Sequence, residues 1–295
     1  MYRTWVITRH TFIEAISQPI YSLLLSIGAA ILLIFAFLPF FTLGEDTVMF
    51  TSVGLDVVTV LVLVVTLFAT SRSVHEEIED RTMLTLMSKP VSRLEVILGK
   101  YLGLFLSAGM AIAVLGALLC LCTWFRIPTD YMLNNRSIDE REINRLFNMR
   151  TSILAGLYPS LLLVWLQIGT LAAISVAIST RFSLVVNLPA VILLYIAGNL
   201  TRFLSDAVIN SSIVTKSLAF LVSTLLPFLE VFDMKKYTVF SKLGMDSGDT
   251  SHVFTSTYIW TNVGLSVLYA AFYAAFALTV GILIFRKREL GGNEG

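Results

Sequence analysis

Six apolar segments run through this chain of 295 residues, and each is long enough to cross a lipid bilayer. A membrane-spanning helix needs about 20 mostly apolar residues, because each residue advances a helix by only ~1.5 Å. The chain is 56% hydrophobic and 14% charged, whereas an ordinary soluble domain carries about 25% charged residues. The sequence therefore predicts an all-α integral membrane protein. Its single transmembrane domain, residues 19–285, would contain six transmembrane helices, at residues 20–43, 51–71, 99–125, 153–180, 182–203 and 259–285.

Basic residues near the ends of these segments predict their orientation, because short cytoplasmic loops are enriched in Lys and Arg. The tail 286–295 begins with three basic residues and the connector 72–98 carries several, whereas the loop 44–50 has none. Both termini are therefore predicted to be cytoplasmic, with residues 126–150 and 204–258 outside. Residues 126–150 fit this rule poorly, since they contain five arginines.

Three shorter segments are predicted to lie at the membrane surface. Residues 1–18 place apolar side chains such as Trp5 and Ile13 between charged ones at roughly helical spacing, which is typical of an interfacial helix. A frayed tail is the alternative. The apolar run 217–229 is too short to span, so it predicts a re-entrant or surface-lying helix before the last span. Residues 137–140 form a capping box, which predicts a short amphipathic helix leading into the fourth span.

A few residues inside the spans allow more than one interpretation. Asp56 either faces the interface or water, or is a carboxylate that lines a transport pathway. Cys120 and Cys122 point to different faces of a helix, which favours packing over a copper(I) site. Small residues four apart on the third span are typical of closely packed membrane helices, and they are Gly99, Gly103, Ser107 and Ala111.

The most polar part of the chain is the connector 72–98, between the second and third segments. Four acids within five positions precede an apolar Met and Leu patch, and Pro90 ends the helix because proline disfavours helical geometry in the residue before it. Ser92 and Glu95 form a second capping box, which starts the next helix. Acidic runs are most often solvated surface. An apolar patch beside charges of both signs, however, is typical of a protein–protein contact, so the connector predicts a cytoplasmic docking surface.

The connector also carries a family resemblance. Its string EIEDRTMLTLMSKPVSRLEVILGKYLG resembles the segment between spans two and three of ABC-2-type transporter permeases, in the branch that includes the permease of the nitrous oxide reductase maturation system. Arg81 departs from the pattern, since many relatives have glycine there. The N-terminus, the six-span plan and residues 226–233 are similar too, so the resemblance covers nearly the whole chain. The matching connector positions are Glu77, Glu79, Thr82, Leu84, Leu86, Pro90, Arg93, Gly99 and Lys100.

The resemblance implies the membrane-spanning permease subunit of an ATP-binding cassette transporter in a bacterial cytoplasmic membrane. The connector would be a coupling helix that sits in a cleft of a separate P-loop ATPase, present in two copies that bind ATP and Mg. A second permease, either this chain or a homologue, and membrane lipid would complete the assembly, which exports or acts mechanically on an unknown substrate. The expected ATPase-coupling residues are Glu76, Glu77, Glu79, Arg81, Thr82, Leu86, Met87, Pro90 and Arg93.

The chain lacks the motifs of an enzyme. Gly99-Lys100 is followed by Tyr101 and lacks the first glycine of a phosphate-binding loop, so no cofactor site is expected in this chain. The three histidines lie far apart in the sequence, which argues against a metal site, and the net charge of +1 offers no basic field for nucleic acid. A secondary transporter or channel, and a membrane scaffold without transport, stay open as alternatives. The first would need ionisable residues at mid-membrane, of which the spans offer few.

Overall fold

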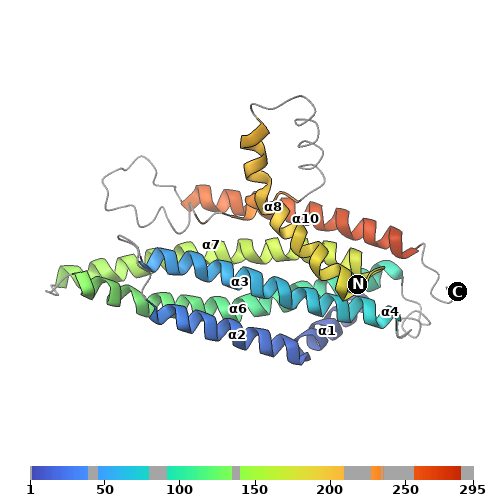
Figure 1. Cartoon of the computed structure of the whole chain (residues 1–295), viewed down its shortest axis with the longest axis horizontal. Helices are drawn as coiled ribbons and strands as arrows, with labels where there is room; N and C mark the ends of the chain where they lie inside the picture. The colour runs from blue at the N-terminus through green and yellow to red at the C-terminus, as the bar shows by residue number, and fades with distance from the viewer. Residues whose placement is uncertain are drawn as a thin grey trace.

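The structure is a computed structural model, and it describes residues 2–38, 46–79, 92–134, 140–208, 227–233, 235 and 256–286. Every regular element in these residues is helical, and none is a strand. Figure 1 shows a bundle of long helices, with α8 inclined to the others. The elements are α1 (Tyr2–Ser17), α2 (Pro19–Phe37), α3 (Asp46–Thr70), the π-helical η1 (Ser71–Glu76), α4 (Glu77–Glu79), α6 (Arg93–Asn134), α7 (Glu140–Ser179), α8 (Leu184–Val208), the 3-10 helix η2 (Leu229–Phe232) and α10 (Ser256–Arg286).

Five of the described helices are long and apolar enough to cross a membrane. The sixth predicted span falls on α8, whose apolar part, Leu184–Leu200, is shorter than the others. The prediction of an all-helical membrane protein is therefore confirmed with five spanning segments, and the sixth span stays a prediction. The five are Pro19–Phe37, Met49–Glu79, Arg93–Arg126, Arg150–Ser179 and Thr257–Phe285.

The centre of the bundle is formed by α3, α6 and α7, which lie side by side in Figure 1. In the apolar 18-residue stretches of α3 and α7, 61% and 67% of the residues are buried inside the protein, against 17% in α2 and 28% in α10. In a lipid bilayer an exposed apolar helix face is stable without a protein partner, because lipid tails are as apolar as leucine. The two outer helices therefore turn most of their surface to lipid, and the protein core rests on α3, α6 and α7.

The N-terminal helix α1 packs on the first turns of α6. Its buried residues are small or polar, Thr8, Thr11 and Ala15, whereas Trp5 is 62% exposed. A Cβ atom added to Gly103 would lie 2.7 Å from Thr11 Cβ and 2.8 Å from the Thr8 carbonyl oxygen, so only glycine permits this approach. All four small residues of the predicted stripe are buried, and its first two positions contact α1.

Two predicted boundaries differ from the structure. α6 continues to Asn134 and α7 begins at Glu140, so the expected short amphipathic helix is the first part of α7. The prediction ended the third span where its apolar run ends, whereas the helix continues into the polar residues after Arg126 and includes Pro128. Residues 135–139, with most of the predicted capping box, and residues 217–226 of the predicted re-entrant helix lie outside the described residues.

Candidate functional site

The candidate site is the end of the bundle where the connector leaves α3 and returns to α6. The structure describes the two flanks of the connector, which contain Glu76, Glu77 and Glu79 on one side and Arg93 on the other. The remaining predicted coupling residues lie outside the described residues, and they are Arg81, Thr82, Leu86, Met87 and Pro90.

The first flank begins where α3 changes to the π-helical turn η1. Thr66 and Thr70 in the last turns of α3 donate their hydroxyls to the carbonyls of Val62 and Thr66, each at 2.7 Å. Such back-bonding satisfies a hydroxyl inside the membrane and loosens the local helix. π-helical turns inside α-helices are rare and frequently mark functional sites. The helix of the second predicted span thus continues past Thr70 through His75, with π geometry from Ser71 to Glu76.

Lys100 is the central residue of this flank, because its side chain is buried and holds η1. Its Nζ atom donates to the Ser73 carbonyl and, at 3.2 Å, to Ser73 Oγ. It also forms an ion pair with Glu77 Oε1 at 2.6 Å. The Lys100 side chain is 3% exposed, and a cation buried to this degree requires such partners. We call Lys100, Ser73 and Glu77 the Lys100 cluster.

The N-terminal helix contributes Glu14 to the surroundings of this cluster. Burial raises the pKa of the Glu14 carboxyl above its usual value. The positive charge of Lys100 opposes the rise, and the Glu77 carboxylate adds to it. Charged side chains of α1, α4 and α6 therefore meet at this end of the bundle, beside Ser73 of η1.

The acids of the connector face two directions. Glu77 is directed into the Lys100 cluster, whereas the side chains of Glu76 and Glu79 are 59% and 72% exposed. Glu76 lies 3.8 Å from Arg72 Nε and Glu79 lies 3.4 Å from His75 Nε2, in i,i+4 pairs on the same helical stretch. The structure therefore leaves Glu76 and Glu79 at the surface and uses Glu77 inside.

The second flank begins with the predicted capping box, which is confirmed. The Ser92 backbone N–H donates to Glu95 Oε2 at 2.9 Å, and the Glu95 N–H donates to Ser92 Oγ at 3.2 Å. Arg93 donates to the Phe285 carbonyl at 2.9 Å, and its guanidinium lies 5.3 Å from the centre of the Phe285 ring. The return of the connector is therefore fastened to the end of α10.

A buried asparagine links η1 to two further helices. Asn187 of α8 lies within hydrogen-bond distance, through Nδ2, of the hydroxyls of Ser71, Ser175 and Ser179, at 3.1, 2.8 and 2.9 Å. An amide nitrogen has only two hydrogens, so at most two of these bonds are donated at once. Three hydroxyls from η1 and α7 thus share one amide, which permits exchange between neighbouring hydrogen bonds when η1 moves.

The opposite part of α3 contains the intramembrane acid Asp56, which is ion-paired with Lys235. A small polar cavity of about 50 Å³ adjoins the pair and is also lined by Gln167, Tyr195 and Asn199. The Asp56 side chain is 56% exposed. In the part of the chain that the structure describes, no group of three or more His, Cys, Asp or Glu residues could hold a metal ion.

Several of these residues were missed at the level of the sequence. Lys100 was recognised only as a family position, although a lysine inside an apolar segment is itself a sign of a buried partner. Asn187 lies inside another apolar segment, and its amide likewise indicated a buried hydrogen-bond partner. The pairing of Asp56 with Lys235 had no local signal, because 178 residues separate them in the chain.

Comparison with known proteins adds one finding. The sequence profile of a family described as ABC-2 family transporter protein matches residues 9–290. A search of the curated proteins found no match. The matched range includes all the described spanning helices, the Lys100 cluster and both flanks of the connector.

Proposed function

We propose, because this chain belongs to the ABC-2 transporter family, that its connector couples ATP hydrolysis on a separate ATPase to movement of the spanning helices. The chain is a multi-pass membrane protein and a permease subunit, and permeases of this family work with an ATPase subunit. The coupled movement would export a substrate or act on it mechanically. Family membership indicates a non-catalytic subunit.

The observation that carries this proposal is the Lys100 cluster. Force on the connector moves the bundle only if the connector is held firmly where it enters the membrane. The buried Lys100 joins α6 to η1 and α4 through Ser73 and Glu77, and Arg93 joins the other flank to α10. Buried charge-assisted contacts resist separation because each partner would be left desolvated and unpaired.

The ATPase contact itself would use the outward-facing part of the connector. Glu76 and Glu79 are available at the surface. Arg81, Thr82, Leu86 and Met87 would complete the contact, with Pro90 fixing the bend. Charged residues around an apolar centre are the usual composition of a protein–protein interface.

The proposed assembly places the chain in a bacterial cytoplasmic membrane with both termini in the cytoplasm. Two ATPase copies would hold ATP and Mg, and a second permease, identical or homologous, would complete the membrane part. The basic residues that begin the C-terminal tail support this orientation.

The test exchanges apolar connector residues for charged ones. The double variant Leu86→Asp/Met87→Asp should reach the membrane but lose the ATPase during affinity purification in mild detergent. The matched control is Met132→Asp/Leu133→Asp, which makes the same changes at the far end of α6 and should keep the ATPase. Retention of the ATPase by the connector variant, or its loss from both variants, would contradict the docking assignment.

A second function is favoured by one observation, the Asp56–Lys235 pair beside a polar cavity within the bundle. Ionisable residues at membrane depth are typical of secondary transporters. The two functions differ in their energy source. Transport that persists in vesicles without ATP, and that Asp56→Asn abolishes, would establish the secondary transporter.

A further inference from the structure

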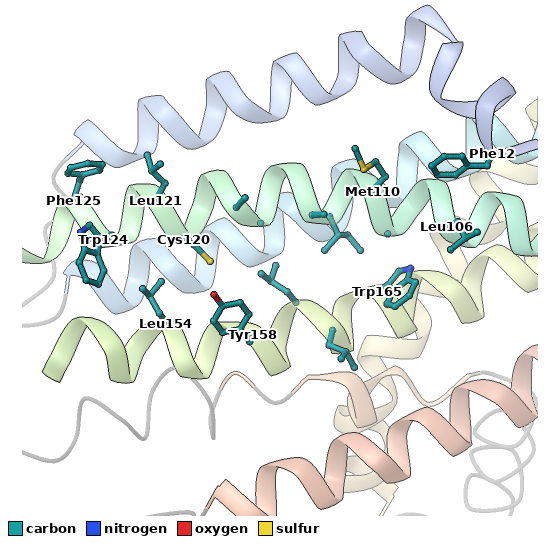
Figure 2. Close-up of a pocket in the computed structure, with 17 residues that line it drawn as sticks. Phe12, Leu106, Met110, Cys120, Leu121, Trp124, Phe125, Leu154, Tyr158 and Trp165 are labelled. Atoms are coloured by element: carbon teal, nitrogen blue, oxygen red, sulfur yellow. The ribbon is translucent and has the colours of Figure 1, made fainter. Parts of the chain in front are cut away.

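A long apolar groove lies between α6 and α7, away from the connector flanks and from the Asp56 cavity. Its volume is about 1030 Å³, and its lining runs from Phe12 and Leu106 at one end to Trp124 and Phe125 at the other. Figure 2 shows Trp124, Cys120 and Leu106 of α6 facing Leu154, Tyr158 and Trp165 of α7 across the space between the two ribbons, and Met110, Leu121 and Phe125 on the other side of α6 in this view. The nineteen residue steps from Leu106 to Phe125 advance a helix by about 28 Å, close to the ~30 Å hydrocarbon thickness of a bilayer.

The groove is open on the protein's surface at membrane depth. Met110, Leu121 and Phe125 line it and are 47%, 54% and 66% exposed. Tyr158 is 65% exposed and also lines the groove, and Figure 2 shows its hydroxyl between the helices. At this depth only hydrocarbon chains or another apolar protein surface can occupy such a groove, because water is absent from the bilayer core.

A cation lies at one end of the groove. The Arg150 guanidinium lies over the Trp124 ring, 4.8 Å from its centre, and Trp124 lines the groove. The Arg150 Nε atom is buried and has no hydrogen-bond partner among the described residues. The guanidinium is a planar fork of hydrogen-bond donors, which suits bidentate recognition of a phosphate.

We propose that this groove is a phospholipid site, in which an acyl chain lies along α6 and α7 and an anionic headgroup phosphate binds Arg150. The half of the groove nearest Arg150 matches the depth of one leaflet. The protein contributes the apolar lining of the groove, and the Tyr158 hydroxyl is a polar contact inside it.

Charge favours a lipid over a second copy of the chain. The groove-forming stretches 96–126 and 150–179 contain no acidic residue. A second copy that docked groove to groove could therefore offer Arg150 no carboxylate from the same surfaces. An anionic phospholipid supplies both the hydrocarbon and the phosphate.

The test measures bound lipid directly by native mass spectrometry. The purified protein, with its membrane partners, is first exchanged into phosphatidylglycerol or into phosphatidylcholine with the same acyl chains. Wild-type protein should retain phosphatidylglycerol about tenfold better. Arg150→Gln should remove this preference, and Arg150→Lys should keep part of it. Equal retention of both lipids by the wild type, or an unchanged preference in Arg150→Gln, would overturn the proposal.

Variants that fill the groove test whether it holds the acyl chain of the lipid. Ala113→Phe/Ala117→Phe places two rings in the groove and should abolish retention of both lipids. Ala271→Phe/Ala275→Phe makes the same change on exposed α10 positions and should behave as wild type. Full retention by the groove variant would overturn the site.

Two measurements avoid reliance on groove-filling variants. In unmodified protein, brominated phosphatidylglycerol should quench tryptophan fluorescence at a lower mole fraction than brominated phosphatidylcholine, and equal quenching would count against the site. In a Cys120→Ala/Cys122→Ala background, a disulfide between two copies at Leu121→Cys would show that the groove is a protein interface, which refutes a lipid occupant.

Discussion

Replacing Lys100 tests the physical argument behind the coupling mechanism. The ammonium and the Glu77 carboxylate are 2.6 Å apart, which corresponds to a gross attraction of about 6 kcal/mol at an effective dielectric constant of ~20. Desolvation of two charges removes several kcal/mol of this gain. Lys100→Met leaves Glu77 and the Ser73 carbonyl without this donor, so we expect it to lower the free energy of unfolding by about 3 kcal/mol.

The double variant separates the pair from the individual side chains. Glu77→Gln alone should cost about 1–2 kcal/mol, because the amide oxygen still accepts a hydrogen bond from Lys100. If the pair is formed, Lys100→Met/Glu77→Gln should cost about 2 kcal/mol less than the sum of the single variants. The measurement is a thermodynamic cycle of reversible unfolding in mixed micelles.

A second cycle on the same helical stretch provides the control. Arg72 and Glu76 are 3.8 Å apart with side chains 55% and 59% exposed, so their coupling should be no more than a few tenths of a kcal/mol. Additivity within ~0.5 kcal/mol in the Lys100–Glu77 cycle would show that the buried pair does not hold the connector. The proposed route of force from connector to α6 would then be wrong.

Three further variants have expected outcomes. Because the pKa of Glu14 is raised in the folded protein, the folded protein binds more protons than the unfolded chain. The free energy of unfolding should therefore fall as pH rises above 4.5. Glu14→Gln should weaken this fall, which unfolding measured over a series of pH values would show. Gly103→Val should cost about 1–3 kcal/mol through contact with Thr8 and Thr11, whereas Gly264→Val, with no neighbour within 4 Å, should not. Arg126→Leu removes three hydrogen bonds to carbonyls at the end of α2 and at its capping residue Leu38 and should lower the thermal midpoint in detergent, with only partial recovery in Arg126→Lys.

Local features were the most predictable part of this protein. The Ser92–Glu95 capping box follows from neighbouring residues, so sequence reasoning identified it. Span length is likewise set by the thickness of the bilayer. The sixth span stays a prediction because the apolar part of α8, Leu184–Leu200, is at the lower limit of spanning length.

The partners of buried polar residues were less predictable. Glu77 belongs to an acidic run, and composition alone suggests that such residues share one solvated face. The structure instead turns Glu77 towards Lys100 and leaves Glu76 outside. Arg126 was expected in an outer loop, but it is buried over the Phe50 ring and caps α2. Long-range pairing decides these orientations, and one sequence contains no direct record of it.

The two polar regions of the bundle share the same helices, and this arrangement bears on mechanism. α3 carries Asp56 in its first half and continues directly into η1. α7 lines the Asp56 cavity with Gln167 and, two to three turns further on, contributes Ser175 and Ser179 to the contacts with Asn187. A helix transmits axial displacement because its backbone hydrogen bonds run along its axis. Movement of η1 by a docked ATPase would therefore displace α3 against α7 at both sites together, and the shared Asn187 amide allows the hydroxyl contacts to exchange during that displacement.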